Sequence, residues 1–291
     1  SRGLGDVYKR QVERSVYYGY EANLMTGTSD TNMYQCILSD IDGTLLTDDH
    51  HMSPKTRDAI KSLDIPFLPV SARSPEGIYP ILKENDIVCP MICFSGGLIL
   101  DEKGQVLYEN GMNYKQTEEV ITFIKEKKFD CTINIYALHD WLVEDKDDPR
   151  VLREERIVKA EAQKGTLSSL DPSRKIHKLL CMCNPLYTKE MEKSLKERFP
   201  HCSIACSSDI LIEIMNEGVT KADAISHLCD YYSINKQDIV AFGDNYNDKE
   251  MLESVGMGIA MGNAPDDIKN IAKDVTSTNN QDGIFNALQK L

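Results

Sequence analysis

Both ends of this chain alternate short apolar runs with amphipathic segments of helical period, and this alternation strongly limits the possible folds. A strand that is followed by a helix and then by another strand forms a parallel sheet with crossover helices. We therefore predict an α/β fold built on a doubly wound, Rossmann-like parallel sheet. Ser53 as an N-cap followed by Pro54 predicts the start of the first helix. The apolar runs that we expect to form strands are residues 34–39, 65–71, 91–94, 238–244 and 258–262.

The middle of the chain interrupts this pattern. Residues 113–206 mix helical and strand-like segments without the regular alternation seen at the two ends. We predict that they form an inserted α/β cap domain, and that residues 33–112 and 207–291 together form the core domain. Residues 1–32 fit neither pattern, and we interpret them as a non-native or disordered N-terminal extension.

Composition excludes several classes of function. The net charge of −13 disfavours binding to nucleic acid or to an anionic membrane surface. No apolar run approaches the roughly 20 residues that a membrane-spanning helix needs. The nine cysteines are scattered and odd in number, which indicates reduced thiols in a cytoplasmic protein. We expect a monomer or homodimer whose partner is a small molecule, with no nucleic acid and no membrane.

Carboxylates follow two of the predicted strands. Asp40 and Asp42 come directly after the first apolar run, Asp244 ends a later one, and Asp248 lies in the next loop. Parallel strands end at the same edge of a sheet, where open α/β sheets bind their ligands, so we expect the four side chains to converge. Their mutual repulsion requires a cation among them, and oxygen ligands favour Mg²⁺.

A carboxylate cluster with Mg²⁺ suits a substrate that carries phosphate. A carboxylate can attack phosphorus and form an aspartyl-phosphate, while a second acid protonates the leaving oxygen and later activates water. Gly43 allows the backbone to approach the phosphate closely. The Ser71 hydroxyl can donate to a phosphate oxygen, and Lys221 can supply positive charge.

Four stretches carry a resemblance to a known family. In chain order they read SDIDGTLL, VSAR, EGVTKADAI and GDNYNDKEML. Together they resemble the four motifs of the haloacid dehalogenase superfamily of phosphohydrolases, in its Cof-type branch with a class IIB α/β cap. The resemblance spans essentially residues 33–291, and the insert lies where this branch carries its cap. It implies Mg²⁺-dependent hydrolysis of phosphomonoesters of small metabolites.

The resemblance also implies a role for each matched residue. Asp40 would be the nucleophile and a metal ligand, and Asp42 the general acid and base, with its backbone carbonyl on the metal. Asp244 would bind Mg²⁺ directly, and Asp248 would support the metal shell. The phosphate-binding residues that the same match implies are Gly43, Ser71, Ala72, Lys221 and Asn247.

Two positions depart from the family pattern. The second motif reads Ser71-Ala72-Arg73 where the branch usually has Thr-Gly-Arg, and Ser95-Gly96 stands where it usually has Asn-Gly. Serine still supplies a hydroxyl, so these changes put the substrate preference in question more than the chemistry. Relatives act on sugar phosphates, pyridoxal phosphate, flavin mononucleotide and nucleotides, and the sequence does not choose among them.

Three alternatives remain. One is phosphoryl transfer in a phosphosugar mutase, and another is a non-catalytic module that binds a phosphorylated metabolite. The third is the metal-binding DxD of a sugar-nucleotide transferase, which leaves Ser71, Lys221 and the GDNYND stretch unexplained. The first motif keeps both of its acids, which disfavours the non-catalytic module.

Overall fold

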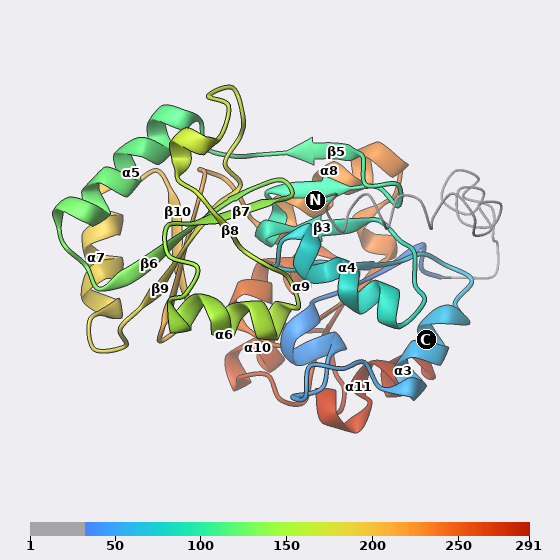
Figure 1. Ribbon diagram of the computed structural model, residues 1–291. Helices are drawn as coiled ribbons and strands as arrows, with labels where there is room; N and C mark the ends of the chain where they lie inside the picture. Colours follow the sequence, from blue (N-terminus) through green and yellow to red (C-terminus); the bar gives the residue numbers. More distant parts are fainter. Residues whose placement is uncertain (1–32) are drawn as a thin grey trace. The chain divides into compact units, whose positions relative to one another are not determined.

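The computed structural model describes residues 33–291, so the prediction for residues 1–32 lies outside the described residues (Figure 1). The described chain divides into two compact units. The first contains residues 33–72, 79–108 and 220–291, and the second contains residues 73–78 and 109–219. Between residues 33 and 291, no helix is both long and apolar enough to cross a membrane.

The first unit is built on a five-stranded sheet in the order β14-β13-β12-β1-β2. Every neighbouring pair in it is parallel. Four residues of β1 and five of β12 are all buried, as expected for strands covered by helices on both faces. The strands are β1 (Cys36–Ser39), β2 (Phe67–Pro69), β12 (Ile239–Gly243), β13 (Met257–Ala260) and β14 (Asp274–Val275).

A three-stranded sheet, β3-β4-β5, belongs to the same unit. A parallel bridge between Val70 and Ile92 links the end of β2 to β3, while β3 and β4 pair antiparallel. The strands are β3 (Met91–Cys93), β4 (Leu98–Leu100) and β5 (Val106–Glu109).

Helices connect these strands in the predicted manner. The first begins where its capping residues predict, since Ser53 accepts a hydrogen bond from the Thr56 N–H and Pro54 is the first helical residue. The helices of this unit are α3 (Pro54–Lys61), α4 (Pro75–Glu84, whose first residues group with the second unit), α8 (Lys221–Tyr232), α9 (Lys249–Ser254), α10 (Asp266–Ile271) and α11 (Gly283–Leu288).

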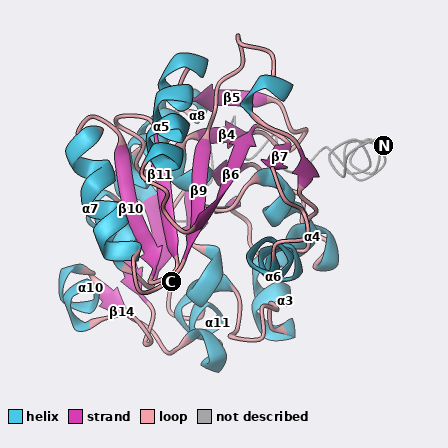
Figure 2. Cartoon of the chain, turned by 60° about the vertical axis from the view of Figure 1, so that its left-hand side comes forward, coloured by secondary structure: helices cyan, strands magenta, loops and turns pink. Residues whose placement is uncertain are grey.

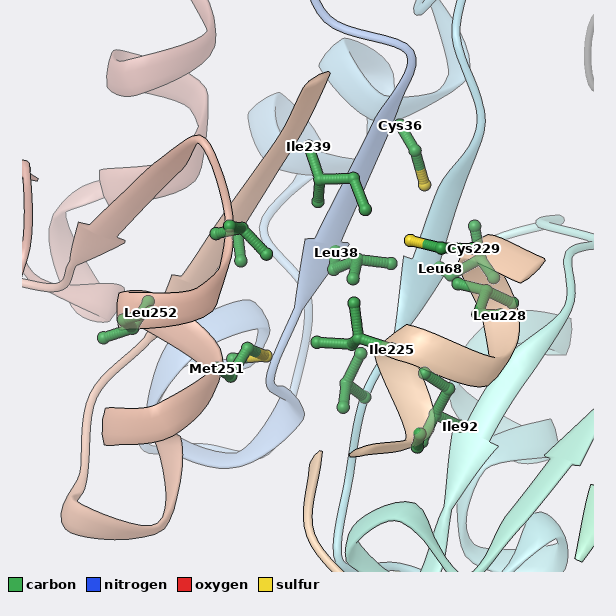
Figure 3. Close-up of a cluster of buried hydrophobic side chains, with 14 of the residues drawn as sticks. Cys36, Leu38, Leu68, Ile92, Ile225, Leu228, Cys229, Ile239, Met251 and Leu252 are labelled. Atoms are coloured by element: carbon green, nitrogen blue, oxygen red, sulfur yellow. The ribbon is translucent and has the colours of Figure 1, made fainter. Parts of the chain in front are cut away.

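The hydrophobic core of the first unit joins the central strands to α8 and α9. Leu38 of β1 packs in one cluster with Leu68 of β2, Ile225 of α8 and Met251 of α9 (Figure 3). Each of these side chains is at most 1% exposed, and burial of such a side chain contributes about 1.5–3 kcal/mol. This packing fixes the positions of the carboxyl ends of the strands, and therefore the positions of the polar residues that follow them.

The second unit contains a six-stranded sheet in the order β10-β11-β9-β6-β7-β8. Its helices α5 and α7 pack against one face, through Val120 and Ile124 of α5 and Met191 and Leu195 of α7 (Figure 2). The elements are α5 (Tyr114–Glu126), β6 (Cys131–Ala137), β7 (Asp140–Val143), α6 (Pro149–Val158), β8 (Gln163–Lys164), β9 (Lys178–Cys183), α7 (Thr188–Arg198), β10 (Ser203–Ser208) and β11 (Leu211–Met215).

The structure differs from the boundary expected at residue 206. That boundary places β11 in the core, but β11 pairs antiparallel with β10 and β9 inside the second sheet. The reason is local: β10 and β11 are separated by two residues and form a hairpin, which keeps β11 beside its partner. The apolar run of β11 resembles a core strand because its last four residues are buried.

Short single turns complete the described chain. One of them, η1, begins directly after β1 and has the i→i+5 hydrogen bond of a π-type turn. It therefore carries the residues that come immediately after the first strand of the parallel sheet. The turns are η1 (Ile41–Leu45), η2 (Phe94–Gly96), η3 (Leu167–Ser169), η4 (Lys236–Asp238), η5 (Tyr246–Asp248) and η6 (Asn279–Gln281).

Candidate active site

Asp40 lies at the carboxyl end of β1, where the strand gives way to η1. Its backbone N–H donates to the Phe242 carbonyl of the neighbouring strand β12 (3.0 Å), which continues the ladder by one residue. Its Oδ1 accepts a hydrogen bond from the Ile41 N–H (2.8 Å). Asp40 is only 7% exposed, so the sheet and the turn together orient a buried carboxyl group.

Asp244 and Asp248 come to the same edge from the end of β12. Carboxylate oxygens of Asp40, Asp244 and Asp248 all lie within 4.8 Å of one another, and these three form the candidate metal group among residues 33–291. Asp248 is fully buried, and its Oδ2 accepts from the backbone N–H groups of Asp244 (2.9 Å) and Asn245 (3.3 Å). The loop after β12 is therefore folded around the Asp248 side chain.

Lys221 lies among these carboxylates. It is the first residue of α8, whose N-cap Thr220 accepts a hydrogen bond from the Asp223 N–H. Its Nζ is 2.7 Å from Oδ1 of Asp248 and 3.3 Å from Oδ1 of Asp40. Lys221 is 3% exposed, so its charge is compensated by two carboxylates inside the protein.

The electrostatics of the group reflect burial first and an excess of negative charge second. Burial raises the pKa of Asp40 well above its usual range, and the charges of Asp248 and Asp244 add to this effect while Lys221 opposes it. Burial and the charge of Asp248 raise the pKa of Asp244 to about 6. Burial lowers the pKa of Lys221, but Asp248 and Asp40 outweigh this and raise the pKa above its ordinary value.

The pKa of Asp244 leads to a prediction about stability. A carboxyl group whose pKa is higher in the folded state binds more protons there, so stability falls as the pH rises through the folded pKa. The metal-free protein should therefore lose stability as the pH rises through about 6, as followed by urea unfolding. The Asp244→Asn variant should show a flatter pH dependence, and an unchanged slope in this variant would contradict the assignment.

The turn η1 brings its glycine against Asp244. Gly43 has φ of +76°, and a Cβ atom built on it would overlap Oδ2 of Asp244. The next residue, Thr44, donates from Oγ1 to Oδ1 of Asp244 (2.8 Å). A glycine is therefore required at position 43 both by the backbone conformation and by the close approach of the carboxylate.

For the phosphatase activity that the four motifs imply, Gly43→Ala is expected to lower turnover by about 10²-fold, because the alanine side chain displaces Asp244. The left-handed backbone adds a stability loss of about 1–3 kcal/mol. Gly104→Ala is the matched control, since Gly104 also has a positive φ (+80°) but lies between β4 and β5. Equal activity losses in the two variants, measured beside their unfolding curves, would contradict the role of Gly43.

The remaining predicted site residues lie outside the carboxylate group and differ in their exposure. Asp42 has a half-exposed side chain, with Oδ1 4.0 Å from Nδ1 of His50, and it lies outside the group of three buried or half-buried carboxylates. Ser71 is 1% exposed just past β2, where its N–H donates to the Ile92 carbonyl (3.0 Å), and Ala72 comes next, half-buried. Asn247 is exposed on η5. The structure thus gathers Asp40, Gly43, Lys221, Asp244 and Asp248 at one edge of the parallel sheet.

Two further residues shape the site, and sequence reasoning did not identify them. Thr44 contacts Asp244, and its place in the first motif was the available signal. Gly243 precedes Asp244, and a Cβ atom built there would lie 2.6 Å from Cβ of Asp248. Gly243 is the first residue of the fourth motif, and that place was the available signal for it.

A parallel α/β sheet with buried acids and a lysine at the carboxyl ends of its strands is the arrangement of an enzyme site. The family model of the haloacid dehalogenase-like hydrolases matches residues 37–288. The chain therefore belongs to the haloacid dehalogenase-like hydrolase family, and the resemblance inferred from its four motifs is confirmed.

Individual relatives agree with this assignment. The chain is 38% identical over 261 residues to a putative phosphatase of Haemophilus influenzae, covering 89% of this chain and 98% of the relative. A crystal structure of a haloacid dehalogenase-like hydrolase from Bacteroides thetaiotaomicron superposes with a TM-score of 0.81 at 25% identity, covering 88% of this chain and 99% of that one. A haloacid dehalogenase subclass IIB sugar phosphatase shares the fold, with a TM-score of 0.76 at 22% identity over 88% and 98% of the two chains.

The comparisons confirm two further predictions in full. The fold is the predicted α/β core with a parallel sheet, accompanied by a second unit with its own sheet. The chain is an enzyme of the haloacid dehalogenase type, as the motifs predicted.

Proposed function

We propose that the protein is a Mg²⁺-dependent phosphatase that hydrolyses phosphomonoesters of small metabolites through an aspartyl-phosphate on Asp40. The observation that supports this most is the meeting of Asp40, Asp244 and Asp248 within 4.8 Å around one buried lysine. A site of this kind suits a hard divalent cation together with a phosphate group. The curated relative at 38% identity, named a putative phosphatase, supports the same reaction class.

The donor set fits Mg²⁺. All three side chains offer carboxylate oxygens, and the one lysine beside them, Lys221, does not balance three negative charges. Asp40, Asp244 and Asp248 would hold the ion with the backbone carbonyl of Asp42. When bound, Mg²⁺ neutralises these carboxylates and the phosphate oxygens that approach them.

The chain's own residues would then carry two displacements. In the first, a carboxylate oxygen of Asp40 forms a bond to phosphorus, the ester oxygen leaves, and Asp42 gives that oxygen its proton. In the second, Asp42 takes a proton from water, whose oxygen attacks phosphorus and releases phosphate from Asp40. The half-exposed side chain of Asp42 supports this role, because a proton carrier must reach both the leaving group and water.

Phosphate binding would fall to the residues around the nucleophile. Lys221 stands 3.3 Å from Asp40 and supplies positive charge beside the attacking oxygen. The φ of +76° at Gly43 leaves backbone without a side chain next to the carboxylates. We assign the remaining phosphate contacts to Ser71, Ala72 and Asn247.

The second unit would select the substrate. We propose a cap domain that comprises the predicted residues 113–206 together with β11 (Leu211–Met215), which belongs to the same sheet. Substrates of this proposal are sugar phosphates, pyridoxal phosphate, flavin mononucleotide or nucleotides. The protein would act in the cytoplasm as a monomer or homodimer.

The direct test is phosphate release from a panel of these phosphorylated metabolites, with Mg²⁺ and with EDTA. Release that requires Mg²⁺ supports the proposal, and the ranking identifies the substrate class. An isomerised sugar phosphate without free phosphate would instead identify a mutase. Absence of turnover in a folded protein would identify a binding module.

A further inference from the structure

Two side-chain amides from the C-terminal part of the chain hold the turn after the nucleophile. Nδ2 of Asn263, which lies just past β13, donates to the Gly43 carbonyl inside η1 (2.8 Å). Nδ2 of Asn279, in η6, donates to the Leu46 carbonyl at the end of the turn (2.9 Å). Gly43 lies in the middle of η1, Leu46 is its C-cap, and Asp40 is its N-cap.

The two amides are also joined to each other. The Asn279 backbone N–H donates to Oδ1 of Asn263 (3.0 Å), which fixes the orientation of the Asn263 amide and directs its Nδ2 toward Gly43. Nδ2 of Asn279 also donates to Oδ1 of Asp48 (3.0 Å), just after the turn. Asn279 is 6% exposed, so loss of its side chain would leave the buried Leu46 carbonyl without this donor.

The held turn carries the contacts that place Asp244. Gly43, whose carbonyl Asn263 fixes, packs directly against Oδ2 of Asp244, and Thr44 donates to its Oδ1 (2.8 Å). The turn also carries Asp42, one residue before Gly43. A shift of the Gly43 carbonyl would therefore move the general acid, Thr44 and Asp244 together.

We propose that Asn263 and Asn279 are positioning residues for the reaction, which hold the Asp40–Leu46 turn in its reactive conformation. This inference rests on the proposed phosphatase function. Both amides act through the turn, so their loss should slow the chemical steps more than it weakens substrate binding. The link runs from η6 through Asn263 to the residues at the carboxyl edge of β1 and β12.

The test compares steady-state kinetics on p-nitrophenyl phosphate with Mg²⁺ for wild type, Asn263→Asp, Asn263→Leu and Asn85→Leu. In Asn263→Asp, one carboxylate oxygen still accepts from the Asn279 N–H, but the other repels the Gly43 carbonyl. Asn85→Leu is the matched control, because Asn85 donates to the Ile81 carbonyl of α4 (2.8 Å), outside both η1 and η6. Thermal unfolding of each variant is measured alongside.

We expect kcat to fall about 10- to 100-fold in both Asn263 variants, with KM within about 3-fold of wild type. The Asn85→Leu variant should keep the kcat of wild type. The inference is overturned if Asn263→Asp keeps its kcat, if only KM changes, or if Asn85→Leu loses as much. An inactive wild type would overturn the phosphatase function and this inference with it. An active wild type whose Asn263→Asp variant keeps its kcat would overturn this inference alone.

Discussion

Asp40→Asn is expected to reduce phosphate release by at least about 10³-fold, because an amide oxygen cannot form the aspartyl-phosphate. The fold should survive, since Asn keeps the size of the side chain and an acceptor for the Ile41 N–H. Removing one carboxylate also relieves repulsion in a group where Asp248 and Asp244 raise the pKa of Asp40. The metal-free variant should therefore unfold at a urea concentration no lower than that of wild type.

The control for this variant is Asp49→Asn, which removes an exposed carboxylate from the same region of the chain. It should leave both turnover and stability near the wild-type values. Near-normal turnover in Asp40→Asn, with the purified protein free of wild type, would remove Asp40 as the nucleophile. Equal losses in both variants would indicate general disturbance of the loop.

Lys221→Met should damage both stability and activity. The Lys221 ammonium group is buried with two carboxylates, and its loss leaves Asp248 buried without its cationic partner. Breaking a buried pair from one side costs about 3–5 kcal/mol. Turnover should fall by at least about 10²-fold, because positive charge beside the reacting phosphate is lost.

The pH dependence of this variant has a definite sign. Lys221 lowers the pKa of Asp40, so its removal raises that pKa further. The folded variant then binds more protons than the unfolded chain, and its stability should recover as the pH is lowered. Urea unfolding at several pH values measures this recovery.

Lys249→Met is the matched control for the lysine, since Lys249 is exposed and pairs with Glu253 at 4.0 Å. It should change stability by no more than about 0.5 kcal/mol. A Lys221→Met protein with the stability and the turnover of this control would contradict the charge balance assigned to the site.

Periodicity predicts most of the core. The run at residues 34–39 contains β1 and the run at 238–244 contains β12. Strands that helices cover on both faces are apolar throughout, so such runs predict central strands of a parallel sheet. The capping residues Ser53 and Pro54 correctly place the start of α3. The predicted domain boundary at residue 206 was wrong for β11, because a buried strand has the same apolar sequence in either sheet. Its pairing with β10 is what places β11 in the second sheet.

The site is predictable to the extent that it lies at strand ends. Asp40, Asp244 and Asp248 meet because β1 and β12 are parallel neighbours, which the alternation of strands and helices implies. The roles of these residues, and of Asp42 and Ser71, stay predictions. Asn263 and Asn279 could not be found this way, because their contacts with the turn join residues more than two hundred positions apart.

The measurement that tests the central claim most directly is acid quenching of the wild-type enzyme during turnover with Mg²⁺, followed by mass spectrometry of its peptides. We predict a phosphoryl adduct on the peptide that contains Asp40, formed within the first turnover and absent from Asp40→Asn. Rapid release of phosphate without any adduct on this peptide, under conditions where a known acyl-phosphate standard survives the quench, would contradict the mechanism.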